Sequence, residues 1–246
     1  MKSLLIKGML ICAGCLTLGV NAATLTAAQD PWPPFITKDK AAGNGISVEL
    51  LTAIMKTQGH EVKFKLIPWA RALDEVKNGR IDLLPATWFT EERTAFLYYS
   101  ESYLENELTF IKRAGDSFEY DGLSSLDGKV VGVVRGYGYG DAFLKAKNFK
   151  KPEAGDLVSN LKKLLAKRIN LTLEDRVVAL SVMENAGMKS SDFSFTKKAL
   201  STNPLYVTSG KANPNGQKYI DDYNKGLAAI KANGTFDKIL AKYGIK

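Results

Sequence analysis

The sequence contains little cysteine and almost no histidine. Its 246 residues include two cysteines and a single histidine, His60. Both cysteines, Cys12 and Cys15, lie within the first 22 residues, a segment typical of an export signal. If this segment is removed, the mature chain has no thiol, which excludes a disulfide framework, a cysteine nucleophile and a cysteine-bound zinc ion. One histidine also excludes a metal site built from several histidines, and a Ser-His-Asp triad would have to use His60.

The first 22 residues have the parts of a signal peptide. Lys2 and Lys7 make the start positive, residues 4–20 are mostly apolar, and small residues precede a predicted cleavage site after Ala22. The apolar segment is short and interrupted by glycine, so it would span a bilayer poorly. An uncleaved membrane anchor is one alternative, and lipid attachment at Cys15 is another, because Cys-Ala-Gly-Cys loosely resembles a lipobox. Cleavage predicts a soluble protein exported to the periplasm.

The overall composition is that of an ordinary globular protein. Hydrophobic residues make up 45% of the chain and charged residues 24%, which excludes disordered and collagen-like classes. The net charge of +8 could favour nucleic acid, an anionic membrane or acidic solutes. The lysines are scattered along predicted helices, however, and no arginine-aromatic RNA module is visible. We therefore interpret the charge as a solvated surface and expect no nucleic-acid partner.

Strand and helix signals alternate along the chain. The first predicted elements are strands at 24–28, 61–67 and 80–84, a helix capped by Ser47 that ends at Gly59, and a helix at 69–78. This order predicts a mainly parallel sheet with helices on its faces. The order recurs later, with a strand at 129–134, a helix beginning near Asp141, and a segment at 161–171 that echoes residues 73–83. The chain closes with two amphipathic helices that stop at Gly234 and Gly244.

The recurrence predicts two α/β lobes, one before and one after about residue 108, joined by strand-like crossings such as residues 107–112. Ligands of open α/β sheets bind beyond the carboxyl ends of the strands. If two lobes present these ends to each other, the cleft between them is the predicted site, and closure about the crossings traps the ligand.

Arg93 follows the predicted strand at 80–84. An arginine at this place can hold a carboxylate through two parallel hydrogen bonds. A surface arginine paired with a neighbouring glutamate is the alternative. Arg71 is a second candidate for holding an anion. The alternative is an arginine that is exposed to solvent on the surface of a helix.

Residues 136–140 form a Gly-Tyr-Gly-Tyr-Gly turn between a strand and a helix. Here Gly136, Tyr137 and Gly138 could converge their backbone N–H groups on an anion at the start of the helix. The third glycine comes one residue too early for a dinucleotide-binding fingerprint. A plain turn is the alternative.

Three further residues could face a ligand. Asp175 closes a late strand of the second lobe, where it could accept hydrogen bonds from an ammonium group, cap the next helix, or do both. Trp32 and Trp69 lie where strands end, so their aromatic faces could enclose a ligand. Packing in the core is the alternative for both tryptophans.

Four blocks of the sequence resemble the bacterial extracellular solute-binding proteins that include the polar amino-acid-binding proteins of ABC importers. These blocks are residues 45–51, residues 78–103, residues 126–133 and residues 233–244. Their order matches that family over nearly all of the mature chain. The resemblance implies a two-lobed periplasmic-binding-protein fold of type II, with a two-strand hinge. It divides the chain into a signal at 1–22, a first lobe at 23–108 plus 206–246, and a second lobe at 109–205.

The resemblance also implies roles for the candidate residues. Arg93 would grip a ligand carboxylate with help from the backbone near Gly136 to Gly138, Asp175 would receive an α-ammonium group, and Trp32 and Trp69 would enclose the ligand. The sequence departs from the family where small hydroxyl residues or glycine commonly precede the arginine. Ala86 and Trp88 occupy these places, so Trp88 would fill space in the cleft. Gln29 stands where some binders of cationic amino acids have an acid, and Arg71 could serve a second acidic group.

We therefore expect a monomer that captures a small carboxylate-bearing or amino-acid-like ligand for an inner-membrane ABC importer, without a cofactor or a metal. Two alternatives stay open. A sensor would present its closed form to a membrane receptor in place of a permease. A dehydratase-like enzyme on the same scaffold would need an acid or base in the cleft, for which Glu174, Asp175 and His60 are the candidates.

Overall fold

The computed structural model describes residues 23–38 and 43–245. The predicted signal peptide, its cleavage after Ala22 and lipid attachment at Cys15 lie outside the described residues. Within these two ranges, no helix has both the length and the apolar character needed to cross a membrane.

The chain folds into short helices and two groups of strands. The α-helices are α1 (Ile46–Thr57), α2 (Trp69–Lys77), α3 (Asp141–Lys145), α4 (Leu157–Leu165), α5 (Arg176–Asn185), α6 (Gly216–Ala232) and α7 (Thr235–Lys242). The 3-10 helices are η1 (Glu92–Ala95), η2 (Leu123–Leu126) and η3 (Ser190–Asp192). The strands are β1 (Thr24–Gln29), β2 (Glu61–Leu66), β3 (Leu84–Trp88), β4 (Leu97–Tyr99), β5 (Leu104–Arg113), β6 (Val131–Val134), β7 (Glu153–Ala154), β8 (Leu171–Asp175), β9 (Phe193–Phe195) and β10 (Ser201–Gly210).

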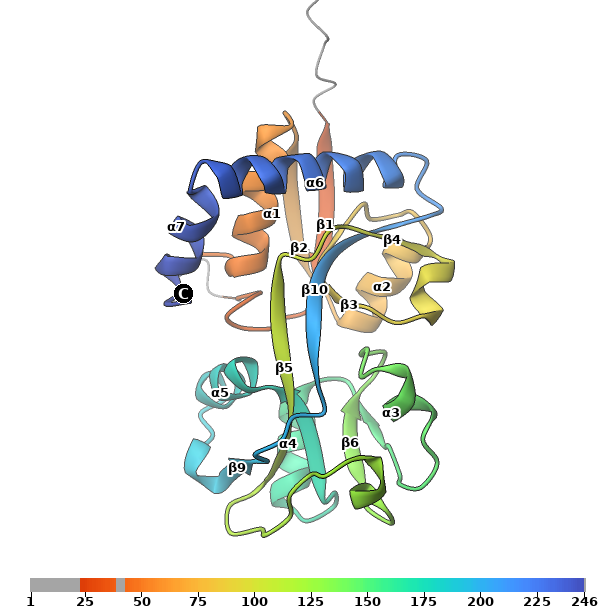
Figure 1. The fold of residues 1–246 in the computed structure, drawn as a ribbon, viewed down its shortest axis with the longest axis vertical. Coiled ribbons are helices and arrows are strands. Elements are labelled where there is room, and N and C mark those ends of the chain that lie inside the picture. The colour runs from red at the N-terminus through yellow and green to blue at the C-terminus, as the bar shows by residue number, and fades with distance from the viewer. Residues whose placement is uncertain (1–22, 39–42, 246) are drawn as a thin grey trace, which may run out of the picture.

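These elements form two lobes joined by the long strands β5 and β10 (Figure 1). We call the group of β1–β4, α1, α2, η1, α6 and α7 the first lobe, and the group of β6–β9 with α3–α5 the second lobe. β1 and β2 pair in parallel in the first lobe, as do β6, β7 and β8 in the second. β5 pairs antiparallel with β10 and then with β8, so it belongs to both lobes. β10 also pairs antiparallel with β3 and β4, so the expectation of a mainly parallel sheet in each lobe is wrong for the strands that pair with the two crossings. The division between the lobes at residues 108 and 206 stays a prediction, because these positions fall inside β5 and β10, which run from one lobe to the other.

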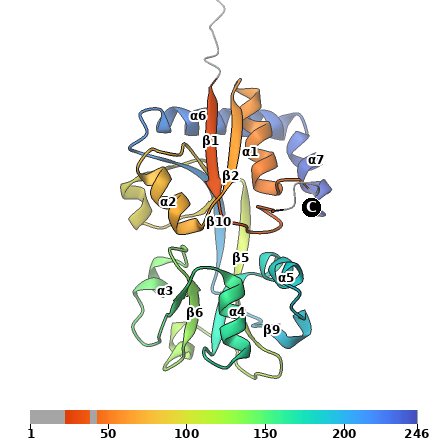
Figure 2. The same cartoon turned by 180° about the vertical axis from the view of Figure 1, so that it is seen from behind.

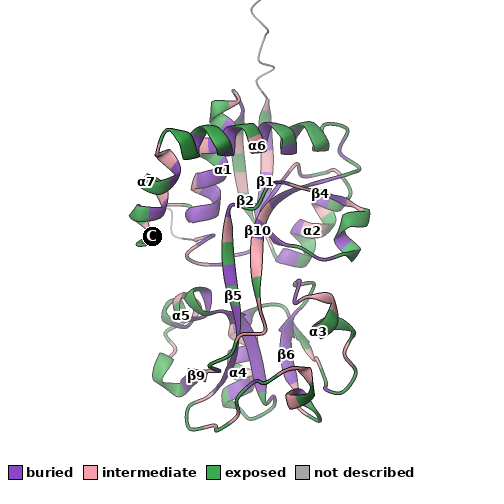
Figure 3. Ribbon diagram, viewed as in Figure 1, coloured by how far each residue is buried: buried purple, intermediate pink, exposed green. Residues whose placement is uncertain are grey.

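Helices cover the sheets on both sides, as the alternating order predicts. α1 packs against α6 and β2 in the first lobe, and α4 covers β6 and β8 in the second (Figure 2). β6 and β8 are buried over their whole length (Figure 3). Burial on both faces suits the apolar sequence of β6, whereas β8 also carries the buried polar residues Thr172, Glu174 and Asp175.

Two local expectations are wrong. Ser47 does not cap α1, because Gly45 occupies the N-cap position with a φ of 94° and no side chain caps the helix. The hydroxyl of Ser47 is instead buried and accepts a hydrogen bond from Tyr103 at 2.8 Å. The strand predicted at 80–84 begins only at Leu84. Before it, Leu83 forms an isolated parallel bridge with Ala27 of β1, and the carboxylate of Asp82 accepts hydrogen bonds from the backbone and hydroxyl of Thr26 at 2.7 and 2.8 Å.

Candidate functional site

Arg93 lies on η1 at the boundary between the two lobes. Its side chain is almost fully buried, and its residue is only 5% exposed. Nη1 donates a hydrogen bond to the carbonyl of Trp88, and Nη2 donates one to the carbonyl of Gly136, both at 2.6 Å. Among the described residues, the ion pairs do not include Arg93. Burial lowers the pKa of this guanidinium. The buried cation is therefore hydrogen-bonded to neutral acceptors, and Glu92 acts on it only electrostatically.

The loop after β6 brings the second lobe against this guanidinium. The carbonyl of Gly136 also accepts a hydrogen bond from Nε1 of Trp69 at 2.8 Å. A Cβ atom on Gly138 would lie 2.9 Å from Cγ2 of Thr90 and 3.1 Å from Nη1 of Arg93. The sequence places glycine here because no larger residue fits between the lobes without displacing a neighbour. The structure thus has the two lobes closed on each other.

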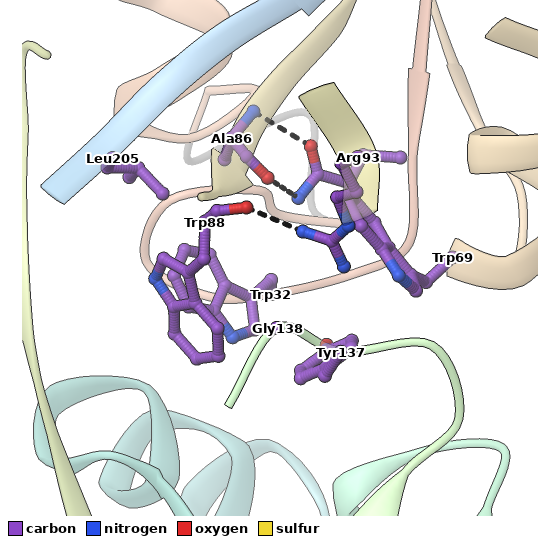
Figure 4. Close-up of a pocket in the computed structure, with 9 residues that line it drawn as sticks. Trp32, Trp69, Ala86, Trp88, Arg93, Tyr137, Gly138 and Leu205 are labelled. Carbon is purple, nitrogen blue, oxygen red and sulfur yellow. Dashed lines mark hydrogen bonds between the residues drawn. The ribbon is translucent and has the colours of Figure 1, made fainter. Parts of the chain in front are cut away.

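Aromatic rings fill most of the space beside Arg93 (Figure 4). The rings of Trp32 and Trp88 meet edge to face at 5.5 Å, and the ring of Tyr137 lies 5.7 Å from Trp88 and 5.9 Å from Trp69. The cavity that remains has a volume of about 20 Å³ and is lined by Gln29, Trp32, Trp69, Ala86, Trp88, Arg93, Tyr137, Gly138 and Leu205. This volume holds about one water molecule. A larger ligand does not fit this cavity, so the lobes must lie further apart in a complex than they do in this structure.

A second and much larger cleft opens on the other side of Trp32 and Tyr137. Its volume is about 840 Å³, and residues of both lobes line it. Two buried carboxyl groups lie in its wall. Asp30 accepts a hydrogen bond from the hydroxyl of Tyr137 at 3.1 Å, and Glu174 accepts one from Nε1 of Trp32 at 3.2 Å. Burial raises the pKa of Asp30 to about 7 and that of Glu174 to about 8.

The candidate Asp175 does not line either of these cavities. Its Oδ1 accepts hydrogen bonds from the backbone N–H groups of Val177 and Val178, which caps α5. Its Oδ2 accepts bonds at 3.2 Å from the side chain of Asn106 and the backbone of Glu107, both on β5. The structure thus gives Asp175 the capping role that the sequence left open. Its predicted contact with a ligand ammonium group has no support from this geometry.

Arg71 is not brought to the site. Its side chain is 69% exposed, and its Nε lies 3.7 Å from Glu75, one turn further along α2. It lines neither cavity, so the structure favours the solvated helix arginine over a second anion holder.

His60 occupies a structural position between α1 and α6. Its Nδ1 accepts a hydrogen bond from the backbone of Ala23 at 3.3 Å, so its Nε2 carries the proton and donates to Asp222 at 2.9 Å. Both ring nitrogens are therefore occupied, and neither is available as the acid or base that an enzyme would need. In the described part of the chain, no group of three or more histidine, cysteine, aspartate or glutamate side chains could hold a metal ion.

Sequence reasoning missed Asp30 and Leu205 and considered Glu174 only as a possible catalytic acid or base. Side chains alternate between the two faces of a strand, so Glu174 and Asp175 point in opposite directions from β8. The alternation indicates that the two acids face different ways, but the pairing of β8 with β5 and β6 decides which one reaches the cleft. Asp30 directly precedes the proline-rich loop that carries Trp32. Its position beside this loop was the one feature of the sequence that pointed to the cleft.

Comparison with known proteins identifies the class to which this fold and cleft belong. The family model for bacterial extracellular solute-binding proteins, family 3, matches residues 25–246, and the chain belongs to this family. The predicted family and fold class are thereby confirmed, and the chain is a solute-binding protein.

Similar proteins cover almost the whole chain. A probable histidine-binding protein of Neisseria gonorrhoeae is 25% identical over 89% of this chain and 82% of its own length. An arginine-binding periplasmic protein of Mannheimia haemolytica is 23% identical, over 94% of each chain. Among solved structures, an ancestral arginine-binding protein bound to arginine has a TM-score of 0.75 and 26% identity, over 89% of this chain and 97% of that one.

Proposed function

We propose that this solute-binding protein captures a small amino-acid-like ligand, whose carboxylate is held by Arg93, and delivers it to an ABC importer from the periplasm. The buried guanidinium carries the proposal. Removing a charge from water costs several kcal/mol unless it is paired, and two carbonyl groups compensate only part of this cost. A carboxylate can accept two parallel, charge-assisted hydrogen bonds from the planar guanidinium.

Both lobes contribute to the place that the carboxylate would take. Arg93 and Trp69 come from the first lobe, whereas Gly136 and Gly138 come from the second. A ligand that contacts Arg93 and the backbone of this loop touches both lobes only when they are closed. It therefore binds the closed form more tightly and shifts the population toward it, which requires no chemical step.

The aromatic residues determine what else fits. Trp32, Trp69 and Tyr137 enclose the site, and Trp88 occupies space where the family commonly has small residues. The indole N–H of Trp88 donates to Asn106 at 3.0 Å, which fixes the ring in place. We expect these rings to restrict the ligand to one that packs against aromatic faces.

The named relatives support the ligand class and the location. The curated relatives are described as binding histidine, arginine or cystine, and the Mannheimia haemolytica protein is named as periplasmic. An amino acid is thus the first ligand to test, and the periplasm is where an importer would receive it.

A thermal-shift screen tests the proposal. Each of the twenty amino acids is added at 1 mM to the protein without its first 22 residues. Binding to the folded form alone raises the melting temperature. At least one amino acid should stabilise the protein, and Arg93→Ala should remove the effect. Arg168→Ala, which alters an exposed arginine of the second lobe, is the matched control and should behave as the unaltered protein. Equal stabilisation of the Arg93→Ala variant would reject Arg93 as the carboxylate holder.

A further inference from the structure

Asn106 lies on the crossing strand β5, and its residue is only 1% exposed. Its Oδ1 accepts a hydrogen bond at 3.0 Å from Nε1 of Trp88, which lines the small cavity beside Arg93. Its Nδ2 donates a hydrogen bond at 3.2 Å to Oδ2 of Asp175. The orientation of the amide is fixed, because an indole N–H only donates and a carboxylate only accepts. One buried amide thus connects a ring of the first lobe to an acid of the second.

The carboxylate of Asp175 is fully occupied by protein donors. Oδ2 accepts from Asn106 and from the backbone N–H of Glu107, and Oδ1 accepts from the backbone N–H groups of Val177 and Val178. An ionised carboxylate has about four acceptor positions. An ammonium group could therefore bind Asp175 only by displacing one of these four donors.

The polar groups beside the small cavity are also bonded within the protein. The side chain of Gln29 donates to the carbonyl of Ala86 and accepts from its N–H, and the carbonyl of Trp88 accepts from Arg93. The described residues that line this cavity include one cation, Arg93, and no acid. An ammonium group supplies three donors, and its burial without an anionic partner is costly. This environment therefore favours a carboxylate that brings no cation with it.

Aromatic and apolar side chains form most of the remaining cavity wall (Figure 4). They are Trp32, Trp69, Ala86, Trp88, Tyr137 and Leu205. Trp32 and Tyr137 also line the larger cleft, where they donate hydrogen bonds to the buried acids Glu174 and Asp30. In a complex, where the lobes lie further apart, the body of a ligand held by Arg93 would lie among these rings. Burial among them stabilises an apolar group, and a flat one most of all.

We propose that Asn106 determines the ligand class: it occupies Asp175 and holds Trp88 in the cavity, so the site prefers a monocarboxylic acid with an apolar body to the corresponding α-amino acid. This inference rests on the proposed function, because it requires a carboxylate at Arg93. An amino acid still binds through its carboxylate, but its ammonium group weakens the complex. Asn106 acts through Trp88 and Asp175 and is therefore a positioning residue.

Pairs of probes that differ only in the ammonium group test the preference by isothermal titration calorimetry. One pair is 3-phenylpropanoate and L-phenylalanine, and the other is 4-methylpentanoate and L-leucine. In each pair, the acid should bind at least fivefold more tightly than the amino acid. Acetate, a carboxylate without an apolar body, should bind at least tenfold more weakly than 3-phenylpropanoate. A smaller difference within either pair, or for acetate, would overturn the inference.

Variants of Asn106 separate its proposed role from a purely structural one. Asn106→Leu removes both hydrogen bonds, so Asp175 loses a donor and can accept from a ligand ammonium group. The ratio of the affinity for the acid to that for the amino acid should then fall at least fivefold. A structural defect would weaken both members of a pair alike and leave this ratio unchanged, and that result would reject Asn106 as the determinant.

Two further variants complete the test. Asn106→Asp can still accept from Trp88 but cannot donate to ionised Asp175, so it should lower the ratio in the same way and replaces Asn106→Leu if that variant does not fold. Asn215→Leu makes the leucine change at an exposed position before α6, where the side chain does not cap the helix. It should leave both affinities of each pair unchanged.

The outcomes distinguish this inference from the proposed function. If both members of a pair bind with dependence on Arg93 and the amino acid binds as tightly as the acid, the inference is wrong and the function stands. If no probe binds at 5 mM, the inference is also rejected, whereas an amino acid found in the thermal-shift screen would still support the function. If the acids bind equally well to Arg93→Ala, both proposals fail.

Discussion

Nη2 of Arg93 lies 2.6 Å from the carbonyl oxygen of Gly136, and this hydrogen bond joins the first lobe to the second. Trp69 donates to the same oxygen. Two side chains that form hydrogen bonds between the lobes therefore also face the proposed ligand. A ligand carboxylate at Arg93 would bind the same guanidinium that contacts the second lobe, so ligand binding and closure involve one side chain.

Gly138→Ala should hinder closure. The added methyl group would lie 2.9 Å from Thr90 and 3.1 Å from Arg93, across the boundary between the lobes. Overpacking of this kind costs about 1–3 kcal/mol, which weakens binding by roughly five- to 160-fold if only the closed form is affected. Small-angle X-ray scattering with saturating ligand should give a larger radius of gyration than for the unaltered protein. Ser190→Ala, a substitution by alanine at an exposed position of η3 that lines neither cavity, is the control. Equal radii and affinities would show that Gly138 is not at a closing contact.

Ligand binding should shift the tryptophan emission to shorter wavelength. The chain has three tryptophans, and all three line the small cavity beside Arg93. Opening of the lobes exposes these rings to water, and closure over a ligand removes them from it. A fluorescence titration with the best amino acid of the thermal-shift screen should therefore saturate with the same dissociation constant as calorimetry. Binding by calorimetry with an unchanged emission spectrum would contradict closure around the tryptophans.

Gln29→Ala should destabilise the first lobe. The side chain of Gln29 donates to the carbonyl of Ala86 at 2.8 Å and accepts from its N–H at 2.9 Å, which connects β1 to β3. The variant leaves both buried groups of Ala86 without a partner, at a cost of about 1–3 kcal/mol. Urea unfolding measures this loss. Gln217→Ala, at an exposed position of α6, should change stability by less than about 0.5 kcal/mol. A loss of unfolding free energy no greater than that of the control would show that the two hydrogen bonds between Gln29 and Ala86 do not stabilise the protein.

Stability of the ligand-free protein should fall as the pH rises from about 5 to about 8. Burial raises the pKa of Asp30 to about 7 and that of Glu174 to about 8, so the folded state binds protons that the unfolded state has released. The free energy of unfolding then decreases by up to about 1.4 kcal/mol per pH unit for each group between its usual and its raised pKa.

Urea unfolding at pH 5, 6, 7 and 8 measures this slope. The Asp30→Asn, Glu174→Gln double variant should have a flatter dependence, because its side chains do not titrate. Parallel curves for the two proteins would show that neither pKa is raised.

Much of the fold could be predicted from the sequence because it depends on local patterns. The alternation of apolar strands and amphipathic helices identified the order of elements, and two of the predicted helix ends at glycine were close to those observed. The displacement of β3 shows the limit of such patterns. The segment at 80–84 looks like a strand, yet within it only Leu83 pairs with β1, through a single parallel bridge to Ala27, and the regular strand begins at Leu84.

The site could be predicted only in part, for a related reason. Arg93, the three tryptophans and the glycine loop were found because their residue types and spacing indicate a role. Asp175 and Glu174 are adjacent, and only the direction of each side chain from β8 tells which one reaches the cleft. That direction depends on pairing with β5 and β6, which no local pattern contains.

A crystal structure with the amino acid that stabilises the protein most is the most direct test of the account. We expect both lobes to enclose the ligand, with its carboxylate oxygens about 2.7–2.9 Å from the guanidinium of Arg93 in place of at least one of the two carbonyl groups. A ligand bound elsewhere, with Arg93 still bonded to the carbonyls of Trp88 and Gly136, would contradict it.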